Sequence, residues 1–171
     1  MRLPQALIAG AVVALALALA APAQAHQPVD LGAADASPAR GPLLPDGTVS
    51  YAVRASVATG DDRGFRFRLK QGDRLAVQVL ILDEPPASTL PPSALPSVTV
   101  VDPRGRRIGM PVRERTEFFE PYSGRTYLYL SRLEQAAVPG EYSVIVRGRS
   151  STRVDTTIAV GYREVPGRVV R

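Results

Sequence analysis

The sequence predicts an all-β protein: a single antiparallel β-sandwich, jelly-roll-like, with about eight strands. Two observations predict this class. Short segments in which apolar and polar residues alternate recur after residue 47, and a period of two is that of a half-buried strand. Turn residues such as Gly, Asp and Pro separate these segments at regular spacing, which is typical of sandwiches and barrels.

The segments justify the strands in order. Val49 to Val57 and Phe65 to Lys70 alternate, so one face of each is expected in the core. Leu75 to Leu82 is apolar almost throughout, as in a central strand covered on both faces. The other expected strands are 98–101, 108–112, 126–133, 142–146 and 154–162. Residues 113–120 are ambiguous, and the proline-rich stretch 85–96 is expected to be an exposed loop.

Residues 1–25 have the pattern of a signal peptide. Arg2 supplies the positive charge, Ala6 to Ala20 form an apolar run, and Ala23-Gln24-Ala25 is an A-x-A cleavage site. The apolar run is shorter than the ~20 residues that span a bilayer, so we expect cleavage before His26. The mature chain is then expected to be exported, periplasmic or extracellular, and to contain no membrane span.

The remaining chain divides into three parts by composition. Residues 26–47 are rich in Pro and Ala with little periodicity, which predicts a flexible tether. The sandwich domain is expected over residues 48–163. Residues 164–171 are polar and are expected to be a frayed tail.

Composition argues against several functions. The sequence has no Cys and a single His, so no Cys–His or Ser–His pair is expected in the core, and zinc ligands are lacking. The net charge is +5, but the arginines are scattered among acidic residues, so no nucleic-acid partner is expected. We therefore expect no enzyme activity and no cofactor.

Four stretches also follow a recognisable order: DDRGFRF at 61–67, QGDRL at 71–75, VVDPRG at 100–105 and PGEYSV at 139–144. This order resembles the bacterial pre-peptidase C-terminal domain, an exported β-sandwich module, over residues 48–162. The resemblance implies a non-catalytic accessory fold and no particular ligand. The stretch FFEPYSGRTY at 118–127 departs from that module and resembles a segment of uncharacterised exported bacterial proteins, some of which continue into a C-terminal membrane helix.

Two tyrosines of one expected strand are candidates for binding. Tyr127 and Tyr129 lie on the face opposite Leu128 and Leu130, so inward leucines would leave the tyrosines as an exposed platform for a sugar or a protein. A tyrosine face that merely packs under a neighbouring loop is the alternative, and the sequence alone favours it. The candidate ligand-binding residues are Glu120, Tyr122, Arg125, Tyr127 and Tyr129.

The candidate metal ligands are Asp61, Asp62 and His26. The two aspartates occupy a turn, where calcium is one interpretation and ordinary turn chemistry is the other. His26 becomes the amino terminus after cleavage, and an α-amino group with an imidazole can chelate Cu(II). A second histidine, which such copper sites add, is missing from the sequence.

The function expected from these observations is a non-catalytic exported module that binds a protein partner, a glycan or another cell-surface component. One alternative is a carboxylate-dependent hydrolase, which needs a pocket with two close carboxylates. The other is an N-terminal copper binder, which needs an exposed His26 and a second ligand from another chain.

Overall fold

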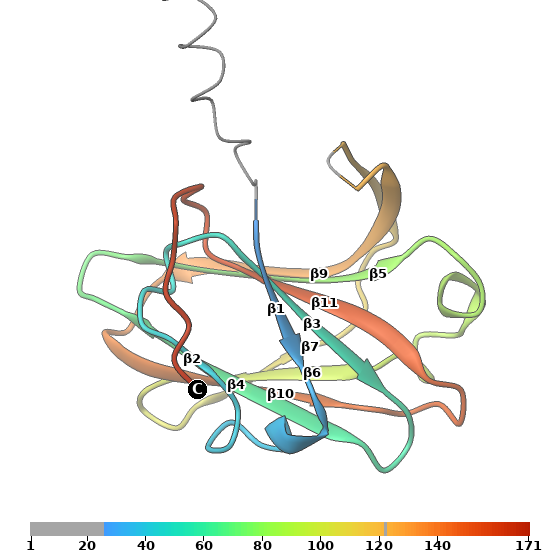
Figure 1. The fold of residues 1–171 in the computed structure, drawn as a ribbon, viewed down its shortest axis with the longest axis horizontal. Coiled ribbons are helices and arrows are strands. Elements are labelled where there is room, and N and C mark those ends of the chain that lie inside the picture. Colours follow the sequence, from blue (N-terminus) through green and yellow to red (C-terminus); the bar gives the residue numbers. More distant parts are fainter. Residues whose placement is uncertain (1–25, 122) are drawn as a thin grey trace, which may run out of the picture.

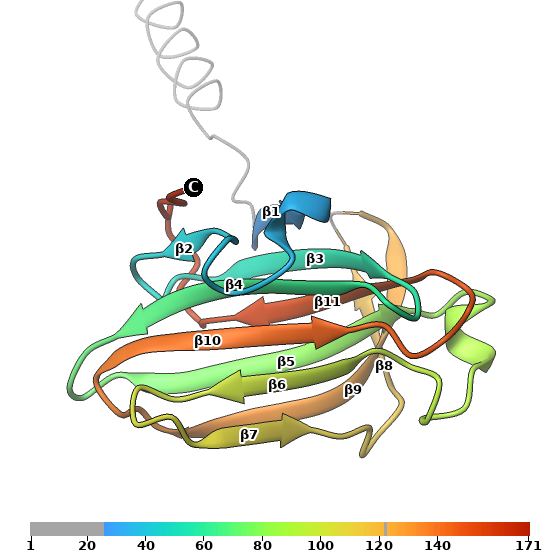
Figure 2. The same ribbon diagram turned by 90° about the horizontal axis from the view of Figure 1, so that it is seen from below.

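The computed structural model describes residues 26–121 and 123–171. Strands make up most of this part, in two sheets that face each other across one core (Figures 1 and 2). The predicted signal peptide and its cleavage site lie outside the described residues, so export stays a prediction. No helix of the described part is long and apolar enough to cross a bilayer.

Each sheet is mixed, not purely antiparallel. The six-stranded sheet has the order β1 (Gln27–Leu31), β3 (Tyr51–Val57), β11 (Val154–Val160), β5 (Arg74–Leu82), β9 (Arg125–Ala136) and β8 (Thr116–Glu120). The five-stranded sheet has the order β2 (Leu43–Leu44), β4 (Asp62–Leu69), β10 (Gly140–Arg147), β6 (Ser97–Val101) and β7 (Arg107–Met110). The β1–β3 and β2–β4 pairs are parallel. The all-β class is confirmed, whereas the expectation of about eight strands in a purely antiparallel arrangement is wrong.

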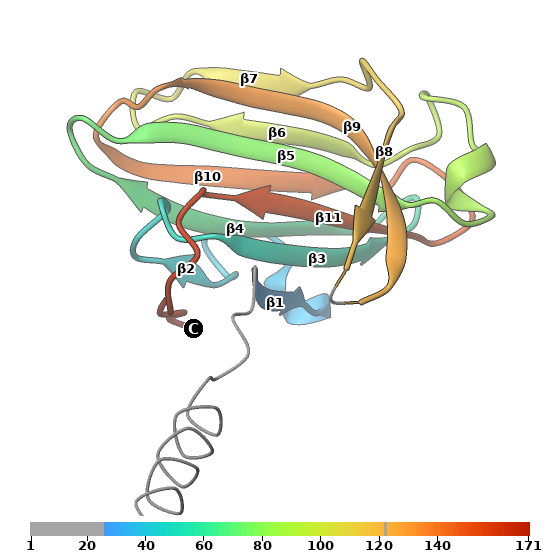
Figure 3. The same ribbon diagram turned by 90° about the horizontal axis from the view of Figure 1, so that it is seen from above.

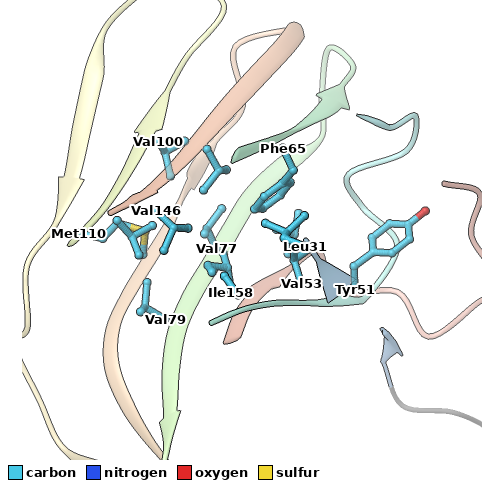
Figure 4. Close-up of a cluster of buried hydrophobic side chains, with 14 of the residues drawn as sticks. Leu31, Tyr51, Val53, Phe65, Val77, Val79, Val100, Met110, Val146 and Ile158 are labelled. Atoms are coloured by element: carbon cyan, nitrogen blue, oxygen red, sulfur yellow. The ribbon is translucent and has the colours of Figure 1, made fainter. Parts of the chain in front are cut away.

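The core lies where the alternating residues of the two sheets meet (Figure 4). Phe65 and Phe67 of β4 are fully buried and face strands of the other sheet. Phe67 stacks on Tyr142 of β10 with ring centroids 5.0 Å apart. The Tyr142 hydroxyl donates to the carbonyl of Val138 and accepts from its N–H, so this buried polar group is satisfied within its own turn.

Residues 26–47, expected to be a flexible tether, belong to the fold. β1 adds to the edge of one sheet and buries Val29 and Leu31, and β2 adds to the edge of the other and buries Leu44. Pro28 made β1 look unlike a strand, but an edge strand tolerates a missing N–H. The short 3-10 helix η1 (Ala33–Asp35) connects β1 to the loop that leads into β2.

The loop before β2 lies directly on β4. A Cβ on Gly64 would stand 2.3 Å from the backbone nitrogen of Pro38, and one on Gly41 would stand 1.8 Å from the Gly64 oxygen. Backbones approach this closely only where side chains are absent. The two glycines therefore allow the N-terminal segment to pack against the five-stranded sheet.

The expected frayed tail is also ordered against the N-terminal segment. Val170 forms an antiparallel bridge with Leu43, and the Arg168 carbonyl accepts a hydrogen bond from the Tyr51 hydroxyl at 3.1 Å. The Gly167 N–H donates to the Gln27 side chain at 2.8 Å. In these contacts the tail uses its backbone groups, and a prediction based on the polarity of its side chains does not consider them.

The ambiguous segment and the proline-rich loop meet at Arg115. Residues 116–120 form the edge strand β8, while Arg115, just before it, donates its guanidinium to the carbonyls of Ser88 and Leu90. The loop contains the short 3-10 helix η2 (Ala87–Thr89) and buries Leu95 completely. It is thus a fixed connection between the sheets.

Candidate ligand groove

The outer face of the six-stranded sheet, which points away from the core, has a low floor at its centre. Ala52 of β3 pairs with Ala159 of β11. In the next row, Thr157 of β11 lies between Arg54 of β3 and Leu80 of β5. Alternate residues of a strand share a face, so Ala52, Ala159 and Thr157 all point outward, and their short side chains leave a depression in the sheet surface.

The β8–β9 hairpin forms one wall above this floor. A bulge shifts the register between Val79 and Leu80, and it turns two consecutive residues of β9, Leu130 and Ser131, toward the core. Bulges bend a strand and increase its twist. Figure 3 shows the hairpin leaving the sheet and passing in front of β11 and β3 on the side of β1.

The start of β1 forms the opposite rim. His26 and Pro28 line the same groove as Glu120 and Ser123 of the hairpin. The His26 ring hydrogen-bonds through Nδ1 to the Ser50 hydroxyl. The groove between rim and wall has a volume of about 300 Å³.

Aromatic side chains make most of the wall. Phe118 of β8 lies opposite Tyr127 of β9 in the ladder, and its ring packs against Tyr129 with centroids 5.5 Å apart. The Arg132 guanidinium carbon lies 3.9 Å from the centroid of the Tyr129 ring. Glu114 forms an ion pair with Arg132, with Oε1 and Nε 3.3 Å apart. Burial raises the pKa of the Tyr129 hydroxyl above its usual value. Tyr129 is therefore fixed on several sides.

Tyr127 makes fewer interactions with its neighbours than Tyr129 does. Within residues 26–121 and 123–171, its hydroxyl has no hydrogen-bond partner. The ring is half-buried and lines the groove. An amphipathic ring with a free polar tip is suited to contact a ligand.

A second hollow of about 380 Å³ adjoins the groove and shares Arg54, Tyr127 and Thr157 with it. Its polar lining carries both signs of charge. Asp30 forms an ion pair with Arg54 at 2.8 Å, and Asp155 accepts a hydrogen bond from Ser56. Arg125 forms an ion pair at 3.1 Å with Glu84, which does not line the hollow. The aromatic groove thus continues into a charged hollow.

The structure brings together most of the predicted binding residues. Leu128 and Leu130 are buried, so Tyr127 and Tyr129 point outward. Glu120 lines the groove and Arg125 lines the second hollow. Tyr122 lies outside the described residues. The flat platform, which the sequence alone made the less favoured interpretation, is instead the wall of a groove, because the hairpin bends over the sheet.

The predicted metal ligands do not converge. The Asp61 carboxylate accepts the Ala58 N–H and pairs with Arg153 at 2.8 Å, while Asp62 pairs with Arg147 at 3.3 Å. His26 lies in the groove instead. No group of three His, Asp or Glu side chains in the described part of the chain could hold a metal ion.

Sequence reasoning missed the second rim and the floor. His26 was singled out as a terminus, not as a neighbour of Tyr127, and Arg54, Leu80 and Phe118 were not singled out for binding. The alternation of each strand gives the face on which a residue lies. It does not give the order of strands, which here places β1, β3 and β11 beside one another.

No family model matches the chain, and no curated protein matches it. The resemblance to the pre-peptidase C-terminal domain therefore stays a prediction. Similar solved structures include BuGH86wt and a variant of it, each in complex with neoagarooctaose, with 14% identity and a TM-score of 0.32. The match covers 64% of this chain but 19% of those chains, and a likeness this weak carries no argument about function.

Proposed function

We propose that the protein is a non-catalytic, exported module that binds a neutral glycan chain along the groove and the adjoining hollow. The observation that carries the proposal is the shared lining of the two, in which Tyr127 stands between an aromatic wall and a polar hollow. A sugar ring offers an apolar C–H face that packs on an aromatic ring, and hydroxyls that both donate and accept hydrogen bonds. Sites of this kind combine an apolar lining with a few placed polar groups.

The charges around the hollow favour a neutral ligand. Two acidic residues, Asp30 and Asp155, and two basic residues, Arg54 and Arg125, line it. Their formal charges cancel, so no net field selects an anion or a cation. Side chains that already hold one another in place are also ready to exchange hydrogen bonds with hydroxyls.

The exposure of the acidic groups favours binding over hydrolysis. A glycosidase needs a carboxyl held protonated by burial in an apolar pocket, facing a second carboxylate across the bond to be broken. Asp30 is instead 76% exposed in its side chain and paired with Arg54. Asp155 is exposed and bound to Ser56. A hydrolase that uses these carboxylates is therefore the less supported alternative.

The proposal is tested on the protein that begins at His26, by calorimetric titration with cellohexaose, xylohexaose and mannohexaose. We expect saturable binding of one of them, weakened by about tenfold or more in Tyr127→Ala, because truncating a central aromatic contact costs about 2 kcal/mol. Phe119→Ala is the matched control, since Phe119 is 59% exposed on the other face of β8 and should leave the affinity unchanged.

Three other results would contradict the proposal. Equal losses in both variants would show that the groove is not the site. Binding of a polyuronate or a peptide in preference to every neutral oligosaccharide would reject the ligand class. Release of shorter sugars from the bound oligosaccharide would make the protein a hydrolase.

A further inference from the structure

Two contacts with Ser50, one from Gln27 and one from the His26 ring, hold the chain at the rim of the groove. The Gln27 N–H donates to the Ser50 carbonyl at 2.9 Å, and the His26 ring bonds to the Ser50 hydroxyl. Ser50 is itself buried, with 4% of its surface exposed. The backbone beside His26 is thus anchored to the sheet, and His26 itself lines the groove.

Cleavage after Ala25 would change the chemistry at this point. Water adds across the Ala25–His26 peptide bond: the C–N bond breaks, the hydroxyl goes to the Ala25 carbonyl carbon, and a proton goes to the His26 nitrogen. A neutral amide with one N–H becomes an amine that takes up a further proton, since the pKa of an α-amino group is about 7.7–8. The rim then carries three N–H donors and a positive charge.

We propose that this α-ammonium group of His26 is itself a binding group of the groove and donates hydrogen bonds to the bound glycan. The inference rests on the proposed function and adds to it a group that exists only after the leader is removed. A charge-assisted hydrogen bond is stronger than one from a neutral amide. The uncleaved chain, which lacks the ammonium group at this place, therefore binds the same glycan more weakly.

Charged and titratable groups surround this position on several elements. Glu120 of β8 lies across the groove, and Arg54 of β3 and Tyr127 of β9 line the same space. Asp30 belongs to β1 itself and pairs with Arg54. Arg163 lies beside Ser50, because the Arg163 carbonyl accepts a hydrogen bond from the Ser50 N–H. The His26 imidazole is at the same rim, so the test below moves the α-amino group while leaving these side chains in place, and it includes a variant without the imidazole.

The test compares two proteins that differ only at the amino terminus. One begins at His26, and the other keeps Gln24 and Ala25 ahead of it, which moves the ammonium group by two residues. Intact mass confirms each terminus. Calorimetry with the hexasaccharides named above is run at pH 7 and pH 9. We expect the longer protein to bind about tenfold more weakly at pH 7, and the shorter one to lose a similar factor at pH 9.

A readout without any sugar keeps the inference testable if no hexasaccharide binds. The amide signals of Glu120 and Tyr127 are followed by NMR from pH 7 to pH 9.5 in both proteins. We expect a transition with the midpoint of an α-amino group in the shorter protein and none in the longer one. His26→Ala in the shorter protein should keep this transition, because it removes the imidazole and leaves the ammonium group.

The outcomes separate the two proposals. Failure of both proteins to bind any hexasaccharide, with the NMR transition present, rejects the proposed function and leaves the ammonium group in the groove. Equal affinities in the two proteins reject the inference and leave the proposed function standing. Absence of the NMR transition in the shorter protein also overturns the inference.

Discussion

Arg171 forms an ion pair with Asp35, and its Nη1 atom lies 3.2 Å from each oxygen of the carboxylate, across 136 residues of sequence. Asp35 is 5% exposed and also accepts the Gly32 N–H at 2.8 Å. Arg171 in addition donates to the Asp30 carbonyl at 2.7 Å. One arginine thus ties the C-terminal tail to the segment that contains β1 and η1.

We predict that Asp35→Ala lowers the free energy of unfolding by about 1–3 kcal/mol, because it removes the acceptor of the Gly32 N–H and of the Arg171 Nη1 group. Glu134→Ala is the control, since the Arg74–Glu134 pair is half-exposed at both ends and such pairs contribute about 0–1 kcal/mol. Urea unfolding followed by circular dichroism measures both. Equal losses would mean that the buried position of Asp35 adds nothing.

We predict that Gly64→Ala destabilises the protein by about 1–3 kcal/mol, because the new methyl group would overlap the backbone of Pro38. Gly109→Ala in β7 is the matched control: a Cβ there meets nothing within 4 Å, so the change should be neutral or slightly stabilising. Thermal unfolding of the two variants checks this. If Gly64→Ala is also neutral, the loop before β2 does not rest on β4.

Removing one oxygen atom tests the turn around Tyr142. Tyr142→Phe keeps the ring stacked on Phe67 but leaves the N–H and carbonyl of Val138 without a partner, so we predict a loss of about 1–3 kcal/mol in urea unfolding. Tyr127→Phe is the comparison, because its hydroxyl has no partner within the described residues. A loss as large in Tyr127→Phe would reject this account.

Asp102 should make the stability depend on acid pH. Loss of hydration raises the pKa of this carboxyl, but hydrogen bonds from Arg106 and from the Arg104 N–H outweigh it, so the net pKa in the folded protein is lowered. A lowered folded-state pKa means that the carboxylate stabilises the fold above its unfolded pKa of about 3.9 and loses this effect as pH falls through the folded value.

The measurement compares the natural protein with Asp102→Asn, which keeps an oxygen acceptor but does not titrate. We expect the natural protein to be the more stable one in urea at pH 7 and pH 5, and the difference to shrink by pH 3. Other acidic groups are common to both proteins, so their titration cancels in the difference. If the difference in the free energy of unfolding stays constant down to pH 3, titration of Asp102 is not its source.

The strands that the sequence predicted are those with strong local patterns. Residues 65–70 alternate apolar and basic side chains, and β4 buries the apolar face as expected. The Asp102–Gly105 turn is also confirmed, since the Gly105 N–H donates to the Asp102 carbonyl. In both cases the information lies within a few neighbouring residues.

The parts that the sequence did not predict depend on distant partners. β2 is two residues long, and β1 contains a proline, so neither has enough local pattern to stand out. Their strand character comes from β3 and β4, to which they pair. The groove is likewise a product of strand order, since its lining comes from β1, β3, β5, β8, β9 and β11. Of the groove lining, only the outward tyrosines of β9 could be predicted from the pattern of their own strand.

The place of β3 has a consequence for how the chain folds. This strand pairs with β1 on one side and with β11 on the other, so the first and the last strands flank it. A sheet built this way has a high contact order, and such chains fold slowly because long loops must close before any contact is gained. A nascent chain that ends before residue 154 has no β11 to cover β3. We expect it to stay open to proteases and chaperones until its last strand has been made.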